Sequence, residues 1–191
     1  IDDFARAMPD GQWLHSRRAS LVDRRVLVLG AGGVGSAIAA RLAPFEVDVT
    51  VVGRSRRDGV LSMDDVPGLL PEADVVILAV PLNPETTHLV DDAFLSGMRE
   101  GALLVNVARG AVVDTDALVS HLMRGRIRAS LDVTDPEPLP PDHPLWQAPG
   151  VLISPHVGGD TTAFVPRAKR LVDGQVTRWL QGEPLEHVVA R

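Results

Sequence analysis

A glycine-rich segment near the amino end of the chain has the spacing of a phosphate-binding loop. It follows an apolar run, Arg25–Leu29, and precedes a helix-like stretch that begins around Gly33. In such a pattern Gly30 allows a tight turn, Gly32 leaves room for a pyrophosphate, and Gly35 lets helix and strand pack closely. Backbone amides at the start of the helix then face the negative charge. The pattern predicts dinucleotide binding, and the alternative is an ordinary strand–turn–helix corner. The segment reads Gly30-Ala31-Gly32-Gly33-Val34-Gly35.

The residues after the second apolar run bear on which dinucleotide would bind. A site for NAD usually carries an acidic residue there, about 20 residues past the glycines, that accepts the ribose hydroxyls. Asp48 lies too early for this, at the start of the run. Arg54 and Ser55 instead suit a 2′-phosphate, through a bidentate guanidinium contact and a hydroxyl hydrogen bond. We therefore expect NADP(H) rather than NAD(H), and the alternative is a solvated basic turn.

Three further segments with chemically useful side chains follow later apolar runs. Because the carboxyl ends of parallel strands meet at one edge of a sheet, we expect all three beside the glycine-rich loop. The segments are Asn106-Val107-Ala108-Arg109-Gly110, Leu131-Asp132-Val133-Thr134-Asp135-Pro136-Glu137-Pro138 and Ser154-Pro155-His156-Val157-Gly158-Gly159.

In order and spacing, these segments and the glycine-rich loop strongly resemble the D-2-hydroxyacid dehydrogenase family, with an NADP-type loop as in its glyoxylate/hydroxypyruvate reductase-like members. The resemblance covers nearly the whole chain. It implies that Arg109 binds the substrate carboxylate, that His156 is the general acid in reduction and the base in oxidation, and that Glu137 holds His156. Hydride transfer to a 2-oxo acid does need a guanidinium fork and a group that protonates the developing alkoxide. Taken singly, each of the three could instead be a surface or loop residue.

The same resemblance implies that Asp132 contacts the nicotinamide carboxamide. We expect Pro81, Val107 and Ala108 to line the path of the cofactor. The other five histidines show no metal-ligand spacing, and we read them as structural or exposed. Hydride chemistry needs no metal. The residues predicted to contact the cofactor are Gly30, Gly32, Gly33, Val34, Gly35, Arg54, Ser55, Pro81, Val107, Ala108, Asp132, His156 and Gly158.

Six short apolar runs rich in β-branched residues must position these groups. Each has the length of a buried strand, and helix-like stretches separate them. Near-continuous apolar strands indicate burial on both faces of a mostly parallel sheet. The prediction is a doubly wound α/β domain of the Rossmann-like class, with flanking connecting helices. The runs are Arg25–Leu29, Val47–Val52, Val75–Val80, Leu103–Val107, Ile127–Asp132 and Val151–Ser154.

Helix signals complete the expected domain, which spans residues 25–160. One helix runs from about Gly33 to Leu42, before Pro44. Another covers Thr115–Met123, with Asp114 as its N-cap. The proline-rich residues 135–144 form a stiff loop. Residues 2–24 and 160–182 both look helical, so we expect a connecting region at 1–24 and a C-terminal helix and tail at 161–191. In the C-terminal helix, the apolar contacts would come from Leu171, Val172, Val176, Trp179 and Leu180.

The composition of the chain limits the kinds of partner that it could bind. The 191 residues carry a net charge of −6 with no long basic run, which argues against nucleic-acid or anionic-membrane binding. The longest apolar runs are too short to cross a membrane. The absence of cysteine excludes disulfides and cysteine nucleophiles and is compatible with the cytoplasm.

Relatives of the family carry a second domain that closes over the substrate, and the corresponding segment is absent here. We therefore expect a fragment or processed product, not a secreted protein, that binds cofactor but reduces a small 2-oxo acid poorly without that wall. The resemblance also implies a homodimer formed through cofactor domains. Two other functions stay open: a dinucleotide-sensing interaction module of the corepressor type, and a cofactor-binding domain without catalysis.

Overall fold

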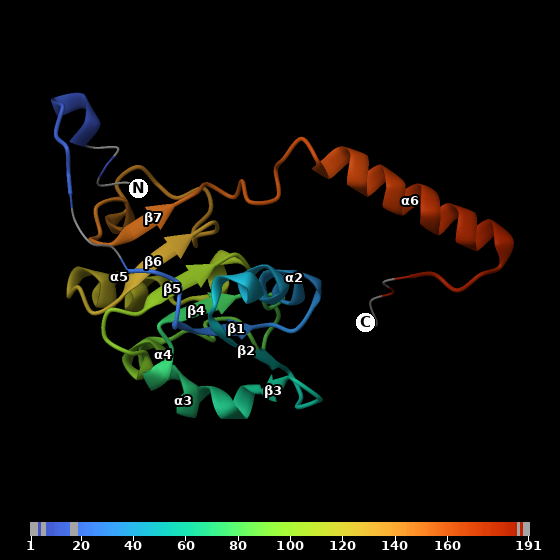
Figure 1. The fold of residues 1–191 in the computed structure, drawn as a ribbon, viewed down its shortest axis with the longest axis horizontal. Helices are drawn as coiled ribbons and strands as arrows, with labels where there is room; N and C mark the ends of the chain where they lie inside the picture. Colours follow the sequence, from blue (N-terminus) through green and yellow to red (C-terminus); the bar gives the residue numbers. More distant parts are fainter. Residues whose placement is uncertain (1–3, 5–6, 16–18, 187, 189–191) are drawn as a thin grey trace.

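The computed structural model describes residues 4, 7–15, 19–186 and 188. Seven parallel strands form one sheet in this part of the chain, in the order β3-β2-β1-β4-β5-β6-β7 (Figure 1). The order reverses between β1 and β4, which places a topological switch point at the carboxyl end of β1. The doubly wound α/β prediction is confirmed. The strands are β1 (Arg25–Leu29), β2 (Asp48–Gly53), β3 (Leu61–Ser62), β4 (Val75–Leu78), β5 (Leu103–Asn106), β6 (Arg128–Leu131) and β7 (Val151–Ile153).

Helices connect the strands, and their ends follow local signals. The helix α2 ends where a 3-10 turn that contains Pro44 takes over, and Asp114 caps α5 by accepting a hydrogen bond from the amide of Ala117 at 3.0 Å. Both helices have the predicted bounds. The helices are α2 (Gly33–Leu42), α3 (Val66–Leu69), α4 (Asp92–Gly97), α5 (Thr115–Met123) and α6 (Phe164–Gln181), and the 3-10 turns are η1 (Met8–Asp10), η2 (Ala43–Phe45), η3 (Met63–Asp65), η4 (Leu70–Glu72), η5 (Gly110–Val112) and η6 (Pro144–Trp146).

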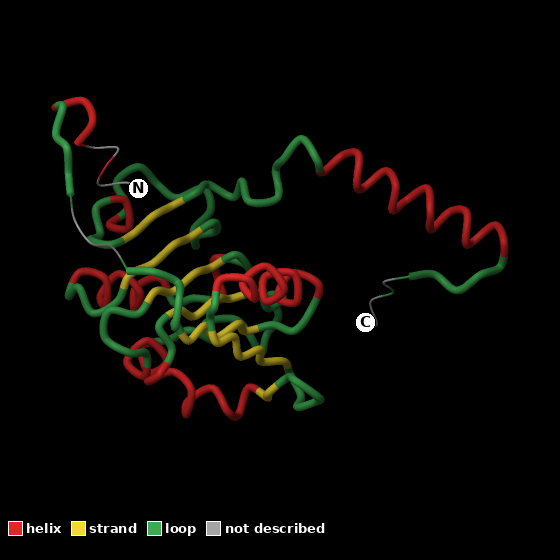
Figure 2. The backbone as a smooth tube through the Cα atoms, viewed as in Figure 1, coloured by secondary structure: helices red, strands yellow, loops and turns green. Residues whose placement is uncertain are grey.

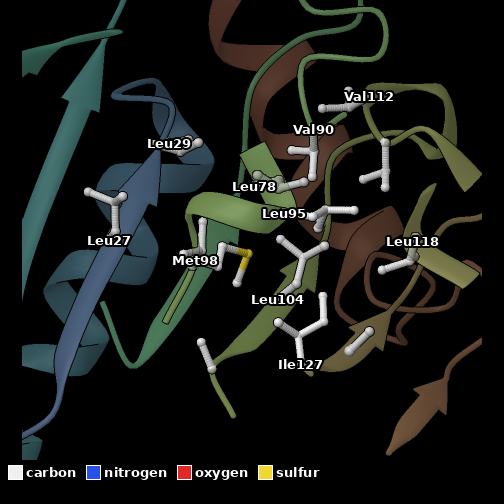
Figure 3. Close-up of a cluster of buried hydrophobic side chains, with 14 of the residues drawn as sticks. Leu27, Leu29, Leu78, Val90, Leu95, Met98, Leu104, Val112, Leu118 and Ile127 are labelled. Atoms are coloured by element: carbon white, nitrogen blue, oxygen red, sulfur yellow. The ribbon is translucent and has the colours of Figure 1, made fainter. Parts of the chain in front are cut away.

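The central strands β1 and β4 are buried on both faces because their side chains alternate between two cores. Leu27 and Leu29 belong to the larger core, which also holds residues of α3, α4 and α5 such as Leu95 (Figure 3). Val26 and Val28 point the other way, toward residues of α2 such as Ile38. This period of two is what a strand imposes on successive side chains. The large core therefore fixes the strands whose carboxyl ends carry the predicted site.

The prediction of a helix through residues 2–24 is wrong over most of its length. Phe4 and Ala7 have helical backbone and η1 follows, but the described residues from Gly11 to Arg24 contain no helix. Gly11 adopts a φ of 62°, which ends the turn in the left-handed region that glycine favours. The rest of the predicted segment at 1–3, 5–6 and 16–18 lies outside the described residues.

The helix predicted within residues 160–182 is present as α6, whose Gln175 exchanges two hydrogen bonds with the backbone of Glu186 in the tail. None of its residues is buried, and the tube in Figure 2 places it beyond the sheet. The five side chains expected to supply apolar contacts to something outside the sheet, Leu171, Val172, Val176, Trp179 and Leu180, are all exposed. No helix among the described residues has the length and hydropathy that crossing a bilayer requires.

Candidate active site

The glycine-rich loop turns sharply at the end of β1, and two of its glycines are required by sterics. Gly30 has a φ of 116°, and a Cβ there would lie 2.3 Å from the carbonyl oxygen of Ala79. A Cβ on Gly35 would lie 1.7 Å from the carbonyl oxygen of Gly30. Both distances are far inside van der Waals contact, so a larger residue at either position would push α2 away from the sheet.

The other two glycines border open space, which is what a bound pyrophosphate needs. A Cβ on Gly32 or Gly33 would meet no atom within 4 Å. The amide of Ser36 donates to the Gly32 carbonyl at 2.9 Å, so the helical hydrogen bonds begin there. The amides of Gly33, Val34 and Gly35 precede that bond and have no partner within the helix. Free amides beside open space at a helix N-terminus fit the negative charge of a dinucleotide.

The basic turn after β2 presents its three arginines differently. Arg54 and Ser55 are exposed, and in the described part of the chain neither forms a hydrogen bond or ion pair. Arg56 pairs with Asp65 at 2.5 Å, while Arg57 donates to the carbonyl of Ala31 at 3.1 Å. Arg54 is therefore the one arginine of the turn whose guanidinium has no partner in the described part of the chain.

Asp65 is a carboxylate near the end of β3 that the sequence prediction did not consider. The amide of Ser62 donates to it at 2.9 Å, and this bond, the Ser62 hydroxyl and the Arg56 guanidinium hold the pKa of Asp65 below its ordinary value. Asp65 is thus committed to capping η3 and to Arg56. Asp65 is therefore occupied, whereas Asp58 in the turn after β2 is exposed.

The loop after β5 carries Arg109 and is held by a buried side chain. Asn106 is 1% exposed. Its Nδ2 donates to the carbonyl of Arg109 and its Oδ1 accepts from the amide of Ala108, both at 3.0 Å. Arg109 itself is exposed, and its guanidinium donates to the carbonyl of Ala108 at 2.6 Å. Asn106 therefore fixes the backbone from which Arg109 projects.

The loop after β7 carries His156 and is organised by Asp132 at the end of β6. The Oδ1 of Asp132 accepts from the hydroxyl of Ser154 at 2.8 Å and from the amides of Val157 and Gly158 at 3.1 Å each. The amide of His156 donates to the carbonyl of Asp132 at 2.7 Å. A Cβ on Gly158 would lie 2.8 Å from Oδ2 of Asp132. Asp132 thus binds the His156 loop, in addition to the cofactor contact predicted for it.

His156 and Glu137 come from different loops and meet in a short hydrogen bond. The Nδ1 of His156 lies 2.6 Å from Oε1 of Glu137. The side chains are 47% and 40% exposed, so solvent and small ligands reach both. With the carboxylate accepting at Nδ1, the ring keeps Nε2 for a second partner. This arrangement suits a histidine that passes a proton to or from a bound molecule.

The Arg109 and Glu137 loops are packed together by backbone contacts. A Cβ on Gly110 would lie 1.9 Å from the carbonyl oxygen of Thr134, so only glycine allows this approach. The hydroxyl of Thr115 donates to the carbonyl of Asp135 at 2.7 Å. The three predicted loops thus converge at the carboxyl edge of β5, β6 and β7.

A cavity of about 640 Å³ joins part of this edge to α2. Its lining includes five residues predicted to contact the cofactor: Val34, Val107, Asp132, His156 and Gly158. Ile38, Gly159, Asp160 and Phe164 complete the lining. The predicted residues that do not line it are Gly30, Gly32, Gly33, Gly35, Arg54, Ser55, Pro81, Ala108, Arg109 and Glu137.

A comparison with models of known protein families shows which family the chain belongs to. The family described as "D-isomer specific 2-hydroxyacid dehydrogenase, NAD binding domain" matches residues 1–158. The chain belongs to this family. The glycine-rich loop lies within the residues that match this NAD-binding domain of the D-2-hydroxyacid dehydrogenase type.

Individual relatives of this dehydrogenase domain agree with the family assignment. The chain is 38% identical to a glyoxylate reductase of Thermofilum pendens, over 85% of this chain and 50% of that protein. It is 36% identical to the human glyoxylate reductase/hydroxypyruvate reductase, over 86% of this chain and 52% of that protein. The chain spans about half the length of the curated relatives it matches.

A solved structure supports the dehydrogenase fold. The D-isomer specific 2-hydroxyacid dehydrogenase from Xanthobacter autotrophicus Py2, in complex with NADPH and MES, superposes with a TM-score of 0.84 at 36% identity. The superposition covers 98% of this chain and 79% of that one.

Two residues that hold the site were not assigned roles from the sequence. Asn106 and Ser154 both stand in the predicted segments, but their hydrogen bonds to Arg109 and Asp132 depend on loop geometry. A polar residue at the end of an otherwise apolar strand is the signal that could have marked Asn106.

None of the other described histidines lines the cavity. His121 is buried and contacts Asp92 at 2.9 Å, and His143 caps η6 by accepting from the amide of Leu145 at 3.2 Å. His15 and His88 are exposed, and His187 lies outside the described residues. Among the described residues, no group of three His, Cys, Asp or Glu side chains is placed to hold a metal.

Proposed function

We propose that this chain is the cofactor-binding part of an oxidoreductase that transfers a hydride between a nicotinamide dinucleotide and a small 2-oxo or D-2-hydroxy acid. The observation that carries the proposal is the 2.6 Å contact between His156 and Glu137 beside a cavity that reaches the start of α2. The glyoxylate and hydroxypyruvate reductases among the relatives support this reaction class. The comparisons lend no support to the dinucleotide-sensing alternative.

The chain's own residues divide the work of reduction. Arg109 binds the carboxylate of the 2-oxo acid through its guanidinium fork and polarises the neighbouring carbonyl. The bound dinucleotide supplies the hydride that adds to the carbonyl carbon. His156 gives the proton on Nε2 to the carbonyl oxygen, which becomes the hydroxyl, and Glu137 stabilises the imidazolium before the transfer. In oxidation His156 accepts that proton back.

The structure's polar contacts favour NADP(H) over NAD(H). Arg56 and Arg57 are engaged with Asp65 and Ala31, whereas Arg54 and Ser55 are exposed and unpaired among the described residues. The solved relative from Xanthobacter autotrophicus binds NADPH. Arg54→Asp is expected to weaken NADPH binding roughly 10- to 100-fold, because a charged hydrogen bond contributes about 1.5–3 kcal/mol, and to spare NADH. A wild-type chain that bound NADH as tightly as NADPH would contradict this preference.

The proposed division of the chain is a connecting region at 1–24, a dinucleotide-binding domain at 25–160, and a C-terminal helix and tail at 161–191 that leads toward a substrate domain. The exposed apolar side chains of α6 support this role. A homodimer and a cytoplasmic location belong to the same proposal. So does poor turnover by the 191 residues alone, because water exclusion needs a second wall over the site.

The test is NADPH oxidation by the full-length natural protein with glyoxylate, hydroxypyruvate and bulkier 2-oxo acids. Arg109→Lys keeps the charge but loses the fork, so the substrate KM should rise and kcat/KM should fall about 10- to 100-fold. Arg124→Lys, on the exposed end of α5, is the matched control and should leave both constants unchanged. Absence of turnover across the panel would contradict the proposal.

A further inference from the structure

Arg57 closes a tight turn between β2 and β3. Its amide donates to the carbonyl of Val60 at 3.0 Å, and the amide of Val60 donates back to the carbonyl of Arg57 at 2.9 Å. Gly59 takes a φ of 67° inside this turn. Two reciprocal backbone bonds fix the position from which the Arg57 side chain starts, so its direction does not depend on the side chain alone.

The Arg57 side chain crosses the end of β2 to reach the glycine-rich loop. Its Nη2 donates to the carbonyl of Ala31 at 3.1 Å. A Cβ on Gly53 would lie 3.5 Å from Nη1 of Arg57, 3.4 Å from Cβ of Ala31 and 3.1 Å from Cγ1 of Val60. The buried Gly53 thus leaves the space in which these three residues meet.

The hydrogen bond to Ala31 fixes a peptide plane in the loop. The Ala31 carbonyl and the Gly32 amide belong to one planar trans peptide, so they point in opposite directions. With the carbonyl held by Arg57, the Gly32 amide is directed away from the basic turn. Residue 32 is also the N-cap of α2, and it borders the open space at the helix N-terminus.

We propose that Arg57 is a positioning residue that fixes the pyrophosphate-binding loop and is not itself a contact for a 2′-phosphate. The inference rests on the proposed function, since it assumes that the loop holds a dinucleotide. One N–H of the Arg57 guanidinium, on Nη2, donates to the chain's own backbone, whereas Arg54 is exposed and unpaired in the described part of the chain. The two arginines therefore contribute to different parts of the ligand, because a fixed loop favours every pyrophosphate.

Four ligands separate the two roles when their affinities for the 191-residue chain are measured by calorimetry. ADP and NADH carry a pyrophosphate without a 2′-phosphate, adenosine 2′,5′-bisphosphate carries the 2′-phosphate without a pyrophosphate, and NADPH carries both. Arg57→Met should weaken ADP, NADH and NADPH by a similar factor of about ten, and adenosine 2′,5′-bisphosphate less. Arg54→Met should weaken only the two ligands with a 2′-phosphate.

Two further variants separate positioning from charge and from folding. Arg56→Met removes the same charge from the same turn, but its partner is Asp65, so ADP affinity should stay within about two-fold of wild type. Arg57→Lys keeps a donor and should bind ADP more tightly than Arg57→Met does. Where Arg57→Met folds poorly, the four ligands are compared between Arg57→Lys and wild type, and a loss confined to the two 2′-phosphate ligands still makes Arg57 a phosphate contact.

Three results would overturn the inference. Equal ADP affinity in Arg57→Met, Arg57→Lys and wild type would show that the bond to Ala31 has no effect on the loop. Selective loss of the two 2′-phosphate ligands in Arg57→Met would make Arg57 a phosphate contact. Failure of the wild-type chain to bind any of the four ligands would overturn the proposed function as well, so the two failures are distinguishable.

Discussion

The Nδ1 of His156 and the Oε1 of Glu137 lie 2.6 Å apart, although the two residues stand on loops that follow different strands. The loop of His156 is held by hydrogen bonds to Asp132 from four residues, Ser154, His156, Val157 and Gly158. The loop of Glu137 packs on Gly110, next to Arg109. The pair is thus the meeting point of the three loops.

Replacing Glu137 with Gln should slow turnover without removing the cofactor. The neutral amide still accepts at Nδ1 of His156, but it no longer stabilises the imidazolium, so kcat in the full-length protein should fall about 10- to 100-fold. Asp142→Asn is the control, because Asp142 lies in the same proline-rich loop with an exposed side chain. A kcat equal in Glu137→Gln and Asp142→Asn would show that the carboxylate charge is unimportant.

Asn106→Leu should affect both stability and substrate binding. Leucine fills the space but leaves the buried Ala108 amide without a partner, at a cost of about 1–3 kcal/mol, and the Arg109 carbonyl keeps only the amide of Val112 as a donor. Urea unfolding measures the loss, and a raised substrate KM in the full-length protein reports the displaced Arg109. Unchanged stability together with an unchanged KM would contradict the role given to Asn106.

Two glycines of the phosphate-binding loop should separate folding from binding. The Cβ that Gly32→Ala adds meets no atom within 4 Å, so the free energy of unfolding should stay near the wild-type value. Dinucleotide affinity should fall, because the added methyl group occupies the space of the ligand. Gly35→Ala collides with the Gly30 carbonyl and should destabilise the fold by roughly 1–3 kcal/mol or more.

Gly68→Ala is the matched control for Gly32→Ala. It also meets no atom within 4 Å, and it lies in α3, away from the loop. It should leave dinucleotide affinity unchanged. Equal affinities for Gly32→Ala and Gly68→Ala would argue against a ligand over the helix N-terminus.

Asp74, at the amino end of β4, should make the fold acid-sensitive. Burial raises the pKa of this carboxyl, but the Arg25 amide and the guanidinium groups of Arg24 and Arg99 lower it more, so the pKa lies below its ordinary value. A lowered folded-state pKa stabilises the protein above the unfolded value of about 3.9, and that contribution is lost as the pH falls through the folded-state value.

The measurement is urea unfolding between pH 7 and pH 2.5. Wild type should lose more unfolding free energy over this range than Asp74→Asn does, because the amide cannot titrate. Asp58→Asn, an exposed residue of the turn after β2, should follow the wild-type curve. Parallel curves for wild type and Asp74→Asn would refute the prediction.

Local signals predicted much of the fold. The apolar run Arg25–Leu29 and the helix Thr115–Met123 have the predicted bounds, because strand burial and the Asp114 cap are readable within a few residues. Other strands end earlier than predicted, such as β4 at Leu78 where Val80 was expected. There the chain leaves the sheet while its side chains stay buried, so hydrophobicity alone does not mark the end.

What the sequence did not reveal depends on contacts distant in the chain. The two-residue strand β3 exists through its pairing with Val52 and Gly53 and is too short for a periodic pattern. Between Gly11 and Arg24 the described residues form no helix, and their large apolar side chains, such as Trp13, are exposed, so no packing stabilises a helix there. The sequence showed which chemically useful residue types stand in the predicted loops. The hydrogen bonds from Asn106 to Arg109 and from Arg57 to Ala31 are visible only in the three-dimensional structure.

The most direct test of the central claim compares His156→Asn with wild type in the full-length protein, measuring NADPH affinity and NADPH oxidation with glyoxylate in the same samples. If His156 supplies the proton, the variant should keep NADPH affinity within a few-fold and lose about 10²- to 10⁴-fold in kcat. An asparagine variant that turns over glyoxylate at the wild-type rate would contradict the account.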